Sequence, residues 1–411
     1  MHEDAVNGAH IGEQPVSALL RDRNRPGSGR VGMVELFFDL VFVFAVTQLS
    51  HTLLAELTFE NLVRVTMLFM AVWWVWMYTA WTTNWLDPER LPVRVCLFVL
   101  TIAGLFLSVS IPHSFAERGI VFASAYASMQ IGRTLFVLWA VRRTPGRLTN
   151  NFQRIAVWLT LSGTCWIIGG LSDPGVRLAW WTLALGIELL GPWALFWVPG
   201  LGRSSLTDWN VDGGHMAERC ALFVIIALGE SLLVTGATFA ELTWDAPTLI
   251  AFFSAVLGSI IMWWLYFDTG AERAQHRIVH AGDPGRTARS AYTYVHIVIV
   301  AGIIVCAVAD EVVLMHPLHG TDAGLLTVLG GPACYLAGAA WFKWLTNDRR
   351  TPPLSHMVGL VLLALLAWPT LAHAITPLVA SIATTLVFAV VAGWETVALS
   401  TIRTRAQPDH R

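Results

Sequence analysis

Acidic, basic and imidazole side chains lie inside otherwise apolar stretches of this sequence. An ionised side chain at the centre of a bilayer costs about 2.5–3.5 kcal/mol or more, so such residues face protein or a water-filled cavity. There a carboxylate or an imidazole can bind and release a proton, and an arginine can pair with a carboxylate. The candidate proton or substrate site consists of Glu35, Asp39, Arg133, His215, Glu218, Arg219, Glu230 and His296.

The carboxylates of one apolar segment share a face, because Glu35 and Asp39 are four residues apart on an expected helix. A second segment, 215–238, carries His215, Glu218, Arg219 and Glu230. These four residues fall within an arc of about 120° on a helix of 3.6 residues per turn. We therefore expect the ionisable side chains of the two segments to form the core of the site.

Glu230 lies near the middle of its segment and follows Gly229, which is expected to let another helix approach closely. We expect Glu230 to pair with Arg133, or with a histidine from a neighbouring helix. Such a pair has a plainer interpretation as well, because one buried ion pair can simply hold two helices in register.

The 20 tryptophans are a second unusual feature. Trp81 and Trp85 suit the aromatic belt at a membrane surface. A belt does not explain the tryptophans that lie deeper, and helix packing is the plainer alternative for them. A candidate aromatic pocket, able to hold a lipophilic or cationic guest, consists of Trp73, Trp74, Trp76, Trp263 and Trp264.

No metal or cofactor is expected. The five cysteines lie in apolar runs without C-x-x-C spacing, which indicates small buried side chains. Glu272, His276 and His280 have i, i+4 spacing that could hold a metal, but an arginine-rich surrounding favours a solvated face. Zinc-protease, phosphate-loop and serine-hydrolase motifs are absent. A net charge of −2 argues against nucleic-acid binding.

The composition indicates an all-α polytopic membrane protein. Of 411 residues, 55% are hydrophobic and 13% are charged, whereas soluble domains carry about 25% charged residues. A membrane span needs about 20 mostly apolar residues. On that rule we predict twelve transmembrane helices, at 33–56, 60–84, 91–111, 118–141, 152–171, 176–198, 215–238, 246–268, 289–312, 322–345, 355–372 and 377–400.

Arginines and lysines predict the orientation, because cytoplasmic loops retain them. Twenty-two of the 26 fall in the two tails and in the loops after every second span. This predicts a bacterial inner-membrane protein with both termini in the cytoplasm and with membrane lipids around it. We expect no cleaved signal peptide, since the first 30 residues are polar.

A weak repeat predicts two six-helix halves. Residues 72–79 (VWWVWMYT) resemble residues 262–269 (MWWLYFDT), and Glu35 and Glu218 each open a long apolar run. The halves would have parallel topology. The expected domains are a cytoplasmic polar tail at 1–31, the halves at 32–200 and 201–402, and a cytoplasmic tail at 403–411.

Three segments resemble the bacterial low temperature requirement protein A family. They are residues 35–45 (ELFFDLVFVFA), 218–231 (ERCALFVIIALGES) and 301–305 (AGIIV), with His316-Pro317 following the third. The resemblance covers residues 31–400 and implies a multi-pass membrane protein. It singles out Glu35, Asp39, Glu218, Arg219 and Glu230 as motif residues without giving them a role.

Three functions fit these residues. The first is a proton-coupled transporter of a small solute, with Glu230 or Asp39 binding the proton. The second is an intramembrane enzyme that uses a carboxylic acid in a tryptophan-lined pocket to protonate a lipophilic substrate, such as an isoprenoid or a lipid. The third is a structural or sensory membrane protein whose polar residues hold the helices together.

Overall fold

The structure is a computed structural model that describes residues 19–22, 29–142, 146–205, 212–268, 289–346 and 351–406. These residues form an all-α protein with twelve long helices, a 3-10 turn η1 (Ile111–His113) and a π-helical segment η4 (Arg289–Val295). The long helices are α1 (Met33–Ala55), α2 (Phe59–Trp85), α3 (Leu91–Ser110), α4 (Gly119–Val141), α5 (Arg147–Leu171), α6 (Pro174–Trp193), α7 (Gly213–Glu241), α8 (Ala246–Tyr266), α11 (His296–Met315), α12 (Asp322–Thr346), α13 (Leu354–Leu371) and α14 (Pro377–Ala406).

Eleven of the twelve described helices are long and apolar enough to cross a membrane. The exception is α6, which carries Arg177 and Glu188 and ends at Trp193, five residues before the predicted limit. It ends early because Pro192 lies in its last turn and the chain then takes left-handed angles at Leu195 and Phe196, with φ of 52° and 48°.

Capping side chains explain where several helices begin. Asp212 precedes α7, and its Oδ1 accepts the backbone N–H groups of Gly214 at 2.9 Å and His215 at 3.2 Å. Asp245 plays the same part for α8 by accepting the Thr248 N–H at 2.9 Å, a bond that lowers the pKa of its carboxyl group. The first turn of α7, and with it His215, is therefore held in place by local hydrogen bonds.

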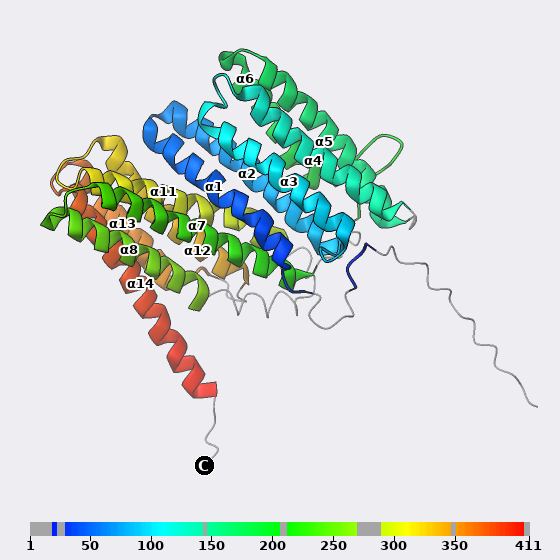
Figure 1. Ribbon diagram of the computed structural model, residues 1–411. Coiled ribbons are helices and arrows are strands. Elements are labelled where there is room, and N and C mark those ends of the chain that lie inside the picture. The colour runs from blue at the N-terminus through cyan, green and yellow to red at the C-terminus, as the bar shows by residue number, and fades with distance from the viewer. Residues whose placement is uncertain are drawn as a thin grey trace, which may run out of the picture.

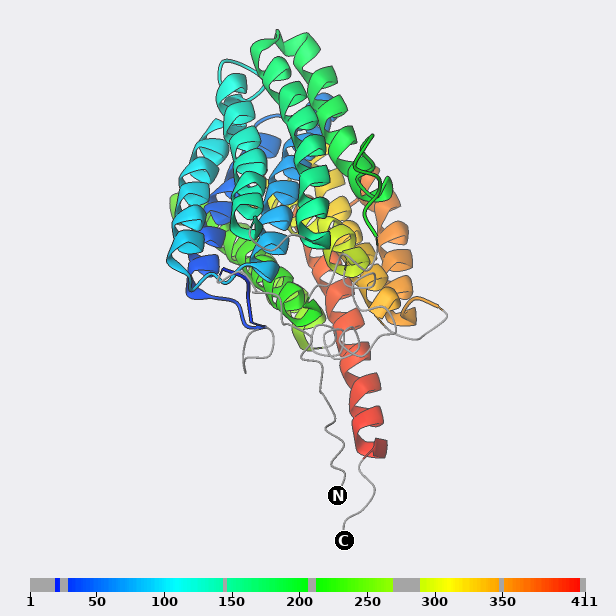
Figure 2. The ribbon, with the colours of Figure 1, turned by 90° about the vertical axis from the view of Figure 1, so that its right-hand side faces the viewer.

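The helices pack in two groups that meet along α1 and α7. Figure 1 shows α1 to α6 on one side of the bundle and α7 to α14 on the other, with α1 beside α7. Both α1 and α2 contact α7 and α11 across this boundary. Figure 2 shows that α1 begins and α14 ends toward the same end of the bundle. Side chains on the facing surfaces of α1 and α7 therefore lie at the junction of the two groups.

Glycines set the close approach of α11 and α12. A Cβ on Gly302 would lie 2.5 Å from the backbone nitrogen of Tyr335, and one on Gly331 would lie 2.7 Å from that of Cys306. These distances leave no room for a methyl group, so the backbones themselves are in contact. By contrast, a Cβ on Gly229 would meet no atom within 4 Å, so the expected close approach at that glycine is wrong.

We predict that Gly302→Ala lowers the thermal unfolding midpoint of the detergent-solubilised protein, because overpacking a tight contact costs about 1–3 kcal/mol. Gly229→Ala is the matched control, since it adds the same methyl group to open space and replaces glycine by a better helix former. Its midpoint should stay the same or rise. Equal losses in the two variants would contradict the assigned packing.

Candidate functional site

Four buried ionisable side chains from α1 and α7 form one network. Asp39 Oδ1 accepts a hydrogen bond from Arg219 Nη2 at 2.8 Å, and Glu35 Oε1 lies 3.4 Å from Arg219 Nη1. The same Glu35 oxygen is 3.0 Å from Nε2 of His215. All four side chains are fully buried. The structure thus brings together the two predicted faces, through direct contacts between their charged groups.

The second oxygen of Glu35 is held from the chain that precedes α1. Glu35 Oε2 accepts the backbone N–H of Gly32 at 2.8 Å, which caps the first turn of α1. It also lies 3.2 Å from Nη2 of Arg21. Arg21 reaches this place because its backbone N–H donates to the carbonyl of Trp85 at 2.8 Å, beside the bridge between Leu20 and Leu86. Glu35 therefore connects three parts of the chain, which are α1 itself, the segment around Arg21 and, through His215 and Arg219, helix α7.

The hydrogen bonds around His215 identify its tautomer. The amide of Asn84 is oriented by Asp212, because its Oδ1 accepts the Asp212 N–H and its Nδ2 donates to the Asp212 carbonyl, both at 2.9 Å. Asn84 Nδ2 therefore also faces His215 Nδ1, 3.3 Å away, as a donor. Nδ1 then accepts, so the proton sits on Nε2, which donates to Glu35, and the imidazole is neutral. The 3.4 Å contact between Nε2 and Arg21 Nη2 is then no hydrogen bond, because both groups are donors.

The network balances its charges but leaves two polar atoms without a partner. With His215 neutral, the carboxylates of Glu35 and Asp39 match the guanidinium groups of Arg21 and Arg219. Asp39 also accepts the indole N–H of Trp76 at 2.8 Å, and Arg219 lies over the Trp76 ring at 5.5 Å. Yet Asp39 Oδ2 and Arg219 Nε make no hydrogen bond. The network is therefore neutral and incompletely satisfied.

The other acidic residues of α7 lie beside this network, each with different surroundings. Glu218 is half-buried and accepts the backbone N–H of Val31 at 3.1 Å. Glu230 lies three turns further along α7, close to Thr47 and His51 of α1, and only 3% of its surface is exposed. Its Oε1 has no hydrogen-bond partner. Glu230 therefore faces α1 and forms no ion pair among the described residues.

Arg133 does not pair with Glu230, so that part of the expectation is wrong, whereas a histidine from a neighbouring helix, His51 of α1, does lie near Glu230. Helix α4 packs against α2, α3 and α5, so Arg133 donates to the Val75 carbonyl at 3.2 Å and to the Thr79 hydroxyl at 3.1 Å. It also donates to the amide oxygen of Gln130. The other end of Gln130 donates to Glu188 at 2.8 Å, which links the two charges through a neutral side chain.

His296 lies at the junction of η4 and α11. Its Nε2 is 2.7 Å from the hydroxyl of Tyr266, and its Nδ1 is 2.9 Å from the carbonyl oxygen of Ala291. A carbonyl oxygen only accepts, so Nδ1 carries the proton and Nε2 accepts from the tyrosine. His296 is fully buried against the rings of Tyr292 and Phe342. Its hydrogen bonds go to Tyr266 and Ala291 and not to the Glu35 network.

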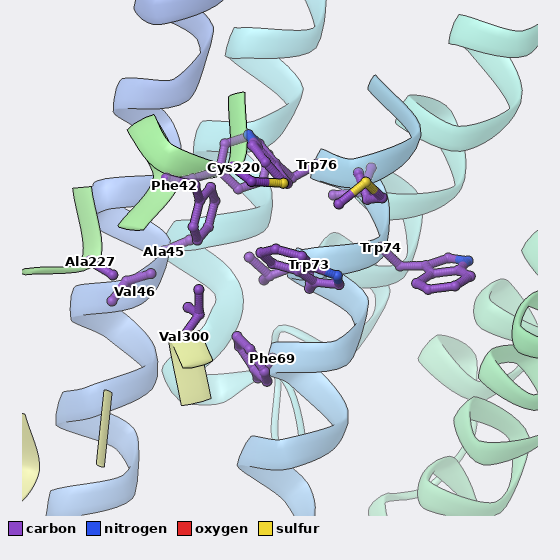
Figure 3. Close-up of a cluster of buried hydrophobic side chains, with 14 of the residues drawn as sticks. Phe42, Ala45, Val46, Phe69, Trp73, Trp74, Trp76, Cys220, Ala227 and Val300 are labelled. Atoms are coloured by element: carbon purple, nitrogen blue, oxygen red, sulfur yellow. The ribbon is translucent and has the colours of Figure 1, made fainter. Parts of the chain in front are cut away.

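The five tryptophans of the predicted pocket do not line one cavity. Trp73 and Trp76 pack on Phe223 of α7, and Figure 3 shows both within the core while Trp74 points the opposite way. Trp263 and Trp264 are 44% and 41% exposed on α8, where Trp264 donates to Thr396. Only Trp74 of these five lines the aromatic cavity of α2.

This aromatic cavity lies between α2, α4, α5, the end of α6 and η4. Its volume is about 40 Å³, and it opens partly to the outside. Its lining consists of Trp74, Met77, Tyr78, Trp81, Thr82, Trp85, Arg133, Thr134, Phe152, Ile155, Pro192, Phe196, Thr293 and Tyr294. Trp81 and Trp85, which were expected in an interfacial belt, are largely buried and form part of the cavity wall.

Several residues of these sites carried no recognisable signal in the sequence. Arg21 looks like an ordinary charge of a polar tail, and Asn84 like the polar end of a span. The metal spacing of Glu272, His276 and His280 falls outside the described residues. Within the described part of the chain, no group of three His, Cys, Asp or Glu side chains is placed to hold a metal ion.

The apolar helices and the buried charges between them define a multi-pass membrane protein with ionisable groups inside its helix bundle. The chain belongs to the bacterial low temperature requirement A (LtrA) family, whose pattern it matches over residues 30–393. It is 42% identical to an uncharacterized protein of Rhizobium meliloti (strain 1021) over 378 residues, a length that covers 90% of each chain. No solved structure matches it.

We predict that Arg219→Gln lowers the free energy of unfolding by about 3–5 kcal/mol, because it leaves the buried carboxylate of Asp39 without a cation and Glu35 with Arg21 alone. Adding Asp39→Asn should restore part of the loss, since one carboxylate then no longer needs compensation. The control is Arg64→Gln, which breaks an exposed pair with Glu60 and should cost about 1 kcal/mol or less. Thermal unfolding in detergent measures these three variants and the Asp39→Asn single variant, and additive losses for Arg219 and Asp39 would contradict direct pairing.

Proposed function

We propose that this protein is a proton-coupled secondary transporter of a small organic solute. The observation that carries the proposal is the buried network of Glu35, Asp39, His215 and Arg219 across the α1–α7 junction. Ionisable groups that join two groups of helices, rather than neighbours within one group, are placed to respond to a movement between those groups. Intramembrane carboxylates of this kind mark proton relays and substrate pathways in membrane transporters.

The charge balance supplies a coupling mechanism. Asp39 is the preferred proton carrier, because one of its oxygens already lacks a partner. A proton on that oxygen leaves the Arg219 charge partly uncompensated in a buried place, which favours an arrangement in which the network meets water. His215 is less suited to take the proton, because Asn84 already donates toward its free nitrogen. Glu230, which lies on α7, is the second proton carrier.

A matching pattern of contacts supports two six-helix halves at 32–200 and 201–402. Contacts α1–α3, α3–α4, α4–α5, α5–α6 and α2–α6 have counterparts in α7–α11, α11–α12, α12–α13, α13–α14 and α8–α14. On α6, Glu188 accepts from Gln130 of α4 and Ser162 of α5. On α14, Glu395 accepts from Lys343 of α12 and Ser355 of α13. Parallel halves of this type are common in secondary transporters.

The aromatic cavity favours transport over acid catalysis. The enzyme alternative requires a carboxylic acid that faces a lipophilic substrate among indole rings. The described lining of the cavity contains Arg133 and no aspartate or glutamate. The carboxylates of the Glu35 network are held by arginines elsewhere in the bundle, so the cavity is better suited to binding a solute than to protonating one.

We predict that both termini are cytoplasmic, because the arginine-rich loops lie on that side. Green fluorescent protein fused after α14 should fluoresce, and alkaline phosphatase inserted in the α1–α2 loop should be active in the bacterial inner membrane. Swapping the two reporters is the control and should silence both. A fluorescent α1–α2 fusion would show the opposite orientation.

We predict that proteoliposomes with an imposed pH gradient accumulate at least one solute from a bacterial metabolite extract, measured by mass spectrometry of the washed vesicles. Accumulation should exceed that of protein-free vesicles and should vanish when an ionophore collapses the gradient. Asp39→Asn should abolish uptake and Glu230→Gln should reduce it, whereas Asp39→Glu, which keeps an ionisable group, should retain part of it.

Arg64→Gln is the matched control, because it removes an arginine charge from an exposed pair outside the network. Each variant is compared only if it elutes as a folded protein. Uptake that is independent of the gradient, or unchanged in Asp39→Asn, would contradict proton coupling through this network. A complete lack of uptake by folded wild-type protein would favour the structural or sensory alternative.

A further inference from the structure

We infer that the aromatic cavity beside α2 is a binding site for a small apolar organic anion, such as an aromatic or alicyclic carboxylate. The inference rests on the charge of one lining residue, on three unsatisfied polar groups and on the apolar remainder of the wall. It depends on the proposed transport function only in its last step, in which the bound anion is the solute that is carried.

Arg133 supplies the charge. Only 1% of its surface is exposed, and among the described residues no carboxylate lies within 4 Å of its guanidinium nitrogens. Its hydrogen-bond partners, a carbonyl, a hydroxyl and an amide oxygen, are all neutral. They occupy both hydrogens of Nη1 and one of Nη2, so two of the five N–H groups stay available. A buried cation that lines a cavity without a direct counter-ion is suited to an anionic ligand.

Three further polar groups of the lining lack a partner. The indole N–H of Trp74, the hydroxyl of Tyr78 and the hydroxyl of Thr293 make no hydrogen bond of acceptable length and angle, although the Trp74 N–H lies near the Tyr78 hydroxyl. The indole can only donate, and each hydroxyl can donate. Leaving such groups unsatisfied in a buried place destabilises the protein. Oxygen atoms of a ligand could satisfy these donors, and a carboxylate can accept several hydrogen bonds at once.

The rest of the wall selects an apolar body. Seven of the fourteen lining side chains are aromatic, among them Trp81, Trp85 and Phe152. The cationic guest expected from tryptophan faces alone is disfavoured, because the one charged lining residue is itself a cation. The ligand is therefore apolar at one end and anionic at the other.

The test is calorimetric titration of the purified full-length protein in detergent with three probes that share one skeleton. These are 3-phenylpropanoate, its neutral amide and 3-phenylpropan-1-amine. The carboxylate should bind saturably, the amide should bind at least about tenfold more weakly because it lacks the charge that Arg133 neutralises, and the amine should not bind. Equal binding of carboxylate and amide, or no saturable carboxylate binding, would overturn the inference.

Variants separate binding from folding. Arg133→Gln should remove the preference for carboxylate over amide. Tyr78→Phe deletes a hydroxyl that makes no hydrogen bond of acceptable geometry within the protein, so the thermal midpoint should not fall, while the carboxylate should bind about tenfold more weakly. Tyr335→Phe is the matched control, because its hydroxyl donates to the Met262 carbonyl away from the cavity. It should lower the midpoint and leave binding unchanged.

Further outcomes distinguish the inference from its rivals. If native mass spectrometry finds an anionic phospholipid that is lost in Arg133→Gln, and the carboxylate does not compete with it, the site is a lipid site and the small-anion inference fails. If the carboxylate binds as expected but proteoliposomes do not accumulate it, the site stands and the proposed transport of this anion fails. If proteoliposomes take up other solutes while the carboxylate does not bind, the proposed transport stands and the small-anion inference fails.

Discussion

The rest of the structure depends on how charge is neutralised between α1 and α7. Removing an ion from water costs several kcal/mol, and the cost is recovered only through close opposite charges and hydrogen bonds. Glu35 and Asp39 meet this condition because Arg219 lies between them and Arg21 joins from the preceding segment. The same contacts hold the first group of helices against the second, and they are strongest when each carboxylate is ionised. This links the stability of the fold to the protonation state of its core.

Helix α2 connects this network to the aromatic cavity. One of its faces carries Trp73 and Trp76, which pack on Phe223, and Trp76 donates to Asp39. The opposite face carries Trp74 and Tyr78, with Trp81 and Trp85 following at helical spacing. A shift of α2 that accompanies rearrangement at Asp39 would therefore also move the wall of the cavity. In a transporter, such a shared element is what couples a proton to a solute.

Much of the fold could be predicted, because the signals for it are local. Apolar runs, proline and glycine breaks and the alternation of arginines placed α1 and α3 within one residue of their observed ends. The meeting of Glu35 and Asp39 with His215 and Arg219 was also predictable, since each pair shares a helical face. The C-terminal end of α6 could not be predicted, because it depends on a left-handed turn at Leu195 and Phe196 that hydropathy does not reveal.

The partners of single residues were harder to predict, because they depend on which helices are neighbours. Arg133 was matched with Glu230 by charge alone, but α4 lies among α2, α3 and α5, away from α7. Trp263 and Trp264 resemble Trp73 and Trp74 in sequence, yet α8 lies at the edge of the bundle and turns them outward. Sequence similarity carries no information about which face of a helix the bundle covers.

Arg219 and Arg133 are both fully buried, but they differ in the charge of their partners, which the residue type alone does not reveal. Arg219 is in direct contact with two carboxylates, and its remaining unpaired atom is a single Nε. Arg133 has only neutral partners, and Gln130 separates it from Glu188. Both side chains bear the same cost of leaving water, but only Arg219 has that cost offset by opposite charge within contact distance. Arg219 is thus suited to holding helices together, and Arg133 to receiving a charge from outside the chain.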